Sequence, residues 1–172
     1  MPSYAIHIAV AEEYMKKHPH LKEEHDKFID GVIVPDMVTD KSLTHYGKDS
    51  SCSNLFRFIK ANELDDSFKR GYFLHLMTDY MFYNKYIDTW SKKCYNDYDI
   101  LNDGIIKKYN LHIPKIAEVH TPPTENKELT ILSENLVNKF IDDVSVLDIN
   151  KVVKEVEYKS EKWTTFRPLK II

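Results

Sequence analysis

The side chains best suited to chemistry lie in an unusually apolar stretch, Gly71 to Phe82, which contains His75 and Asp79. Apolar residues on nearly every side of this stretch predict a buried helix. Residues four apart on a helix share a face, with Cβ atoms about 5–6 Å apart. A buried carboxylate needs a compensating partner, and imidazole and carboxylate are both zinc ligands. The pair therefore indicates either a metal site or a His–Asp hydrogen bond within the core.

Three further segments supply side chains of the same types. His7 lies in the apolar run Ala5–Ala11, Asp36 directly follows the hydrophobic segment 31–35, and His45 lies on the next loop. Taken singly, a histidine in an apolar helix is most often a core residue, and an aspartate after a helix end is most often a turn residue. Together the four segments offer three histidines and two aspartates, which is a donor set for metal ions.

The order of these residues resembles the zinc-dependent phospholipase C family, whose all-helical fold is shared by fungal zinc-dependent single-strand nucleases. The resemblance rests on a histidine near the N-terminus, Gly-x-x-x-Pro-Asp at 31–36, His-Tyr-Gly at 45–47 and Gly-Tyr-x-x-His-x-x-x-Asp at 71–79. It covers roughly the first half of the chain, from Met1 to about Tyr86. The ordered set is more specific than His-x-x-x-Asp alone.

The resemblance implies a role for each of the five residues. His7 matches the histidine of one zinc, His45 and His75 match the two histidines of a neighbouring zinc, and Asp79 matches the carboxylate that bridges both ions. Asp36 matches an aspartate beside the metals, which is a ligand or the catalytic base that orients the attacking water. The implied activity is phosphodiester hydrolysis, in which metal-bound water attacks phosphorus, with a phosphodiester or phospholipid-like molecule as substrate.

The second half of the chain departs from the family pattern. Family enzymes hold a third zinc with two histidines and a glutamate downstream of the His-x-x-x-Asp pair, and no His-x-x-x-Glu follows it here. His112, Glu118 and His120 form a substitute trio, although their proline-rich setting favours a surface loop. Asp97 and Asp99 are reserve ligands, although carboxylates at a helix start are favoured by the helix dipole alone. We therefore expect one or two zinc ions rather than three.

Two other hypotheses remain open. The reduced ligand set is compatible with a non-catalytic helical protein that keeps a structural metal at His45, His75 and Asp79. The adjacent His25 and Asp26 are typical of helical metal-dependent phosphohydrolases of the HD type, although adjacent residues diverge on a helix.

The amino-acid composition narrows the classes of protein to which the chain can belong. The 172 residues include 24 Lys and Arg against 27 Asp and Glu, and this balance does not favour a nucleic-acid binder that relies on bulk positive charge. Hydrophobic residues make up 42%, enough for a core, yet no apolar run approaches the ~20 residues of a membrane span. With two cysteines and no signal-peptide pattern, we expect a cytoplasmic protein without a transmembrane segment. The oligomeric state is not indicated.

Helical periodicity runs through most of the chain and predicts the elements that position these side chains. We predict an all-α, single-domain bundle of about six to seven helices over residues 1–172, with the fold of the phospholipase C and nuclease families and a C-terminal tail at 160–172. The predicted helices cover residues 4–15, 21–32, 49–59, 65–90, 97–109, 125–142 and 148–156. Residues 36–48 and 111–124 are predicted to be a loop and an extended connector.

Overall fold

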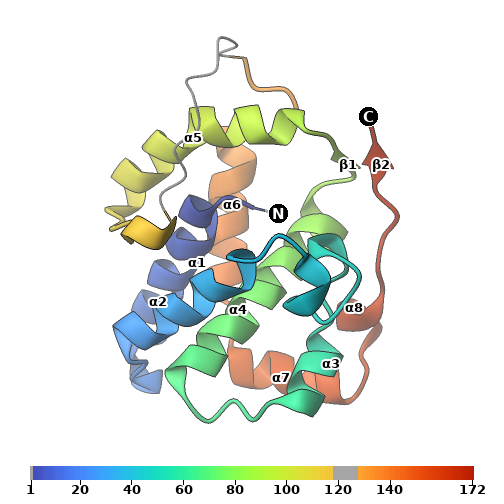
Figure 1. The fold of residues 1–172 in the computed structure, drawn as a ribbon. Helices are drawn as coiled ribbons and strands as arrows, with labels where there is room; N and C mark the ends of the chain where they lie inside the picture. The colour runs from blue at the N-terminus through green and yellow to red at the C-terminus, as the bar shows by residue number, and fades with distance from the viewer. Residues whose placement is uncertain (1, 118–127) are drawn as a thin grey trace.

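The computed structural model describes residues 2–117 and 128–172, and these form an all-α single domain, as predicted (Figure 1). The helix count in the described residues is eight, above the predicted six to seven, because the short α8 lies within the predicted tail. The α-helices are α1 (Tyr4–Lys17), α2 (His25–Ile33), α3 (Leu55–Ala61), α4 (Ser67–Met81), α5 (Lys93–Tyr109), α6 (Glu134–Ser145), α7 (Ile149–Glu157) and α8 (Glu161–Thr164). Single turns lie at η1 (Pro19–Leu21), η2 (Val34–Asp36), η3 (Lys41–Leu43), η4 (Ser50–Cys52), η5 (Phe82–Tyr86) and η6 (Lys115–Ala117).

The C-terminal segment packs against the rest of the chain. Trp163 of α8 is buried, and β2 (Lys170–Ile171) pairs in parallel with β1 (Thr89–Trp90). Figure 1 shows this segment running along one side of the molecule to reach β1. Trp163 of the predicted tail therefore contributes to the core.

The helix that carries His75 and Asp79 lies at the centre of the fold. Asp66 accepts a hydrogen bond from the backbone amide of Lys69 at 2.8 Å and so caps the start of α4. Residues 73–80 are all buried, and α4 contacts α1, α2, α3 and α7 (Figure 1). Despite this apolar character, no helix among the described residues combines the length and hydrophobicity needed to cross a membrane.

Two glycines let α2 and α4 approach until their backbones touch. A Cβ atom on Gly71 would lie 2.1 Å from the carbonyl oxygen of Phe28, and one on Gly31 would lie 2.0 Å from that of Phe68. Real Cβ contacts are never this short, so only glycine fits at either position. The contact brings the end of α2, which leads to Asp36, against the helix that carries His75.

We expect Gly71→Ala to destabilise the protein by about 3 kcal/mol, because the added methyl group meets backbone that cannot move independently. Gly104→Ala on α5 is the matched control. A Cβ atom there meets nothing within 4 Å, so we expect a gain of about 0.5–1 kcal/mol from helix propensity alone. Urea unfolding of both variants measures the difference. Equal effects in the two variants would show that the close contact between α2 and α4 is not required.

Several helix boundaries differ from the sequence predictions, and α5 begins at Lys93 rather than at residue 97. The second helix begins at His25 rather than at residue 21, because 19–21 form a separate turn that begins with proline. The predicted helix 65–90 ends as α-helix at Met81 and continues as a single π-helical turn to Tyr86. Within 49–59, Asp49 caps the short turn η4, and Asn54 separately caps α3.

The helix predicted over 125–142 instead covers Glu134–Ser145. Buried Asp97 accepts hydrogen bonds from the amides of Thr130, Ile131 and Leu132 at 2.9, 2.8 and 2.9 Å. These amides are therefore occupied by a carboxylate of α5, and α6 starts only after Ser133 caps it. A contact across 35 positions of sequence decides this boundary.

Candidate metal centre

The structure brings all five predicted site residues together in one buried cluster. His7 comes from α1, Asp36 from η2 directly after α2, and His45 from the loop before η4, whereas His75 and Asp79 lie one turn apart on α4. Their exposed fractions range from 0% to 6%. Four separate segments therefore deliver three imidazoles and two carboxylates to one point in the core. This cluster could hold a metal ion.

A first position that could hold a metal ion lies among Asp36, His45 and His75, and Asp79 Oδ2 lies beside the same two histidines. His45 Nε2 lies 3.2 Å from His75 Nε2, 3.6 Å from Asp36 Oδ1 and 2.9 Å from Asp79 Oδ2. His75 Nε2 lies 3.8 Å from Asp36 Oδ1 and 3.6 Å from Asp79 Oδ2. In a tetrahedral zinc site with bonds of about 2.0–2.1 Å, neighbouring ligand atoms lie about 3.4 Å apart. The five separations given above, 2.9 to 3.8 Å, are close to this spacing of ligand atoms.

A second position that could hold a metal ion lies among His7, His75 and Asp79. His7 Nε2 lies 3.4 Å from Asp79 Oδ1 and 3.8 Å from Asp36 Oδ2. The His7 ring stacks on that of His75, with centroids 4.0 Å apart and planes 7° from parallel. Each carboxylate therefore presents one oxygen to His7 and the other to His45 and His75.

Hydrogen bonds on the outer sides of two rings fix which nitrogen faces the cluster. His75 Nδ1 lies 2.7 Å from the carbonyl oxygen of Val32, which can only accept, so Nδ1 carries the proton. Thr44 Oγ1 donates to the carbonyl oxygen of Pro35 at 2.8 Å and therefore accepts from His45 Nδ1 at 3.0 Å. In their neutral forms, both rings direct the unprotonated Nε2 inward. Two lone pairs then face each other beside a carboxylate, which is favourable only with a cation between them.

Several buried polar atoms of the cluster make no hydrogen bond. They are both ring nitrogens of His7, both oxygens of Asp36, and Asp79 Oδ1. Buried polar atoms in native proteins are almost always hydrogen-bonded or bound to an ion or a water. Their number at one point, together with the inward-facing nitrogens, fits the donor set of a metal centre.

A proton is the other cation that the cluster can hold. Burial acts to lower the pKa of His75, but the charges of Asp36 and Asp79 outweigh it and raise that pKa. Burial also acts to raise the pKa of Asp79, but its contacts with His45, His7 and His75 hold it well below its usual range. The metal-free cluster therefore favours a carboxylate paired with an imidazolium. A metal ion would replace that proton.

Acidification should destabilise the metal-free protein between pH 6.5 and 4. Burial, followed by the charge of His75, lowers the pKa of His7 from 6.5 to about 4. Below pH 6.5 the unfolded chain binds a proton that the folded chain excludes until about pH 4, so the free energy of unfolding falls by roughly 3 kcal/mol. The raised pKa of His75 also stabilises the fold, but this contribution is fully present below pH 6.5 and is lost only at higher pH. His75 therefore does not change the free energy of unfolding between pH 6.5 and 4.

Urea unfolding of chelator-treated protein across that window measures the change. His7→Asn is the control, since asparagine does not titrate there and its unfolding free energy should vary much less. If the wild type and His7→Asn show the same pH profile of unfolding free energy, His7 does not cause the loss of stability and the prediction is wrong.

The loop that presents His45 is held in an uncommon backbone conformation. Tyr46 has φ of 57°, in the left-handed region that bulky side chains seldom adopt. A Cβ atom on Gly47 would lie 1.9 Å from the carbonyl oxygen of Cys52, so the loop folds tightly on itself. The hydroxyl of Tyr72 donates to the carbonyl oxygen of Thr44 at 2.7 Å and ties the loop to α4. Strained backbone of this kind is concentrated at functional sites.

The reserve ligands considered from the sequence lie elsewhere. His112 is exposed, and Glu118 and His120 lie outside the described residues. Asp97 is occupied by the three backbone amides before α6, and Asp99 is half-buried two residues further along α5. Within residues 2–117 and 128–172, neither aspartate belongs to a group able to hold a metal.

The His25–Asp26 dyad also lies outside the cluster. Both residues are exposed at the start of α2, and the second ring nitrogen of His25 lies 2.8 Å from Glu12. The dyad therefore forms a surface ion pair, and the hypothesis of an HD-type centre loses its defining pair.

Sequence reasoning did not identify the groups that support the ligands. These are Thr44, the backbone carbonyls of Val32 and Pro35, and Lys41. Among these supporting groups, only the threonine next to His45 is a signal in the sequence. A backbone carbonyl is present in every residue, so the sequence does not mark the ones that bind a ligand.

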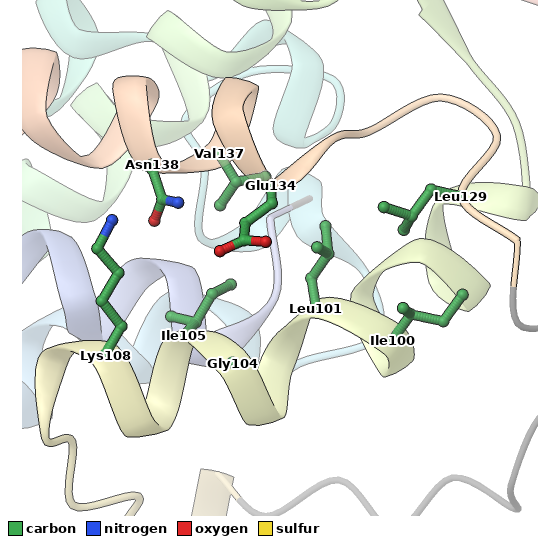
Figure 2. Close-up of a pocket in the computed structure, with 9 residues that line it drawn as sticks. All are labelled: Ile100, Leu101, Gly104, Ile105, Lys108, Leu129, Glu134, Val137 and Asn138. Carbon is green, nitrogen blue, oxygen red and sulfur yellow. The ribbon is translucent and has the colours of Figure 1, made fainter.

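A surface groove between α5 and α6 is separate from the cluster. Figure 2 shows its lining, in which the apolar side chains of Leu101, Ile105 and Val137 lie around the carboxylate of Glu134, with Lys108 at one end. Its volume is about 220 Å³, below the usual range for small-molecule sites. It contains none of the predicted site residues.

In comparisons with known proteins, no protein-family model, curated protein or solved structure matches the chain.

Proposed function

We propose that this protein is a zinc-dependent phosphodiester hydrolase of the phospholipase C type, with two zinc ions in the buried cluster. The observation that carries the proposal is the pair of carboxylates, each of which presents one oxygen to His7 and the other to His45 and His75. Two metal ions about 3.5–4 Å apart, bridged by carboxylates, are the usual centre of enzymes that hydrolyse phosphate esters. The order of the five residues along the chain supports the same family.

Each residue has a distinct role in this proposal. His45 and His75 would hold one ion through the nitrogens that their outer hydrogen bonds leave unprotonated. His7 would hold the other ion, and Asp79 would bridge both. When bound, the zinc ions supply a water of lowered pKa and positive charge for the phosphoryl oxygens. Asp36 would orient that water and accept its proton as phosphorus is attacked.

One observation favours the second candidate, a structural metal without catalysis. The side chains of His7, Asp36, His45, His75 and Asp79 are all fully shielded from solvent. A substrate phosphate needs a path to the metal, and Lys41, which contacts Asp36, has a side chain that is only 18% exposed. The hydrolase proposal therefore requires residues around the cluster to open a path for the substrate.

Turnover of bis(p-nitrophenyl) phosphate by zinc-loaded protein distinguishes the two candidates. For the hydrolase we expect zinc-dependent release of nitrophenol that a chelator abolishes and added zinc restores. One tightly bound zinc per chain with no turnover of this or other phosphodiesters would instead indicate the structural site.

A further inference from the structure

Lys41 is a cation built into the edge of the cluster. Its ammonium group lies 3.1 Å from Asp36 Oδ1 and donates hydrogen bonds to the carbonyl oxygens of Asp36 and Val38 at 2.7 and 2.8 Å. The ammonium therefore binds the loop backbone through two hydrogen bonds, and its charge faces the Asp36 carboxylate. The side chain is 18% exposed, so most of it lies within the loop.

The contacts of Lys41 fix the orientation of the Asp36 carboxylate. Residues 36–41 close around the ammonium, and Thr44 adds a hydrogen bond to the carbonyl oxygen of Pro35 at 2.8 Å. With Oδ1 held toward Lys41, His45 and His75, Oδ2 is left facing His7. The bridging orientation of this carboxylate therefore depends on a residue outside the five donors.

The same ammonium opposes a metal ion by charge. It shares Asp36 Oδ1 with the position between His45 and His75, so any divalent ion there lies close to a fixed positive charge. Repulsion between cations in a partly buried setting is much stronger than in water. The carboxylates and Lys41 thus have opposite effects on metal affinity.

We propose that Lys41 is a positioning residue that holds Asp36 in its bridging orientation while weakening metal binding by charge. This inference rests on the proposed function for its catalytic consequence, but its effect on metal affinity does not. A residue that only stabilised the loop would favour metal binding. Lys41 should instead lower the affinity for metal. It should also keep Asp36 correctly oriented and give the site a net positive charge that attracts an anionic phosphodiester.

The test compares three variants in the full chain. Lys41→Met removes the charge, Lys41→Arg keeps it but does not reproduce three local contacts, and Lys48→Met removes an exposed lysine of the same loop as the matched control. Zinc affinity is measured by competition with a chelator, and kcat and KM with bis(p-nitrophenyl) phosphate. Unfolding of each metal-free variant shows which of them fold.

For Lys41→Met we expect zinc to bind about tenfold more tightly and kcat to fall about tenfold or more. Lys41→Arg should keep wild-type zinc affinity with a reduced kcat, and Lys48→Met should match the wild type in both. Unchanged or weaker zinc binding by Lys41→Met, or tighter binding by Lys41→Arg, would overturn the inference. Absence of turnover in the wild type would instead overturn the proposed hydrolase and leave the affinity comparison to decide the role of Lys41.

Discussion

Asp79→Asn should lower the affinity for zinc by about 100- to 10,000-fold. Asp79 presents one oxygen to His45 and His75 and the other to His7, so its carboxylate contributes to both halves of the cluster. Removing one charged partner of a buried ionic group costs about 3–5 kcal/mol, and each 1.4 kcal/mol is a factor of ten in affinity. Asparagine keeps the size of the side chain, so the fold should persist.

Chelator competition measures this loss, and thermal unfolding gives an independent test. Zinc in large excess over its dissociation constant should raise the Tm of the wild type by several degrees and leave that of Asp79→Asn nearly unchanged. Asp30→Asn, at an exposed position of α2, is the matched control and should behave as the wild type. Undiminished zinc binding by a folded Asp79→Asn variant would contradict both the catalytic and the structural hypotheses for the metal.

Asp36→Asn should separate metal binding from hydrolysis. Three donors, His45, His75 and Asp79, remain around the first position, so we expect zinc to be retained there. Asparagine cannot accept a proton from the attacking water, so turnover of bis(p-nitrophenyl) phosphate should fall about 100- to 10,000-fold. Zinc content per chain and kcat are the two measurements.

The exposed Asp26 supplies the control for this experiment. An HD-type phosphohydrolase would lose its metal with Asp26→Asn, whereas a centre at the buried cluster would be unaffected. Wild-type turnover by Asp36→Asn would show that this carboxylate is not the base.

The donors of the cluster could be predicted from sequence because their positions follow from local rules. His75 and Asp79 share a face of any helix that contains them, and an apolar sequence on every side predicts that this helix is buried. A charged residue in such a helix requires a partner, and the other polar residues in apolar segments are the candidates. The helix caps Asp66 and Asp148 follow equally local rules, since their hydrogen bonds reach only three residues along the chain.

The features that sequence did not predict depend on contacts between distant segments. The start of α6 is set by Asp97, 35 residues before Leu132. The carbonyl oxygen of Val32 fixes the His75 ring from 43 residues away. The contact between α2 and α4 depends on Gly31 and Gly71, whose need for close approach is apparent only once the helices are placed. Lys41 resembles any other loop lysine until the loop is folded.

The most direct test of the two-metal centre is anomalous diffraction at the zinc absorption edge, from crystals of the full chain grown with zinc. We predict two peaks about 3.5–4 Å apart, one beside Nε2 of His45 and His75 and the other beside Nε2 of His7, with Asp79 in contact with both and Asp36 beside them. A single peak bound by His45, His75 and Asp79 would contradict the two-metal centre and favour the structural site. No peak within the cluster would contradict any metal-dependent role for these five residues.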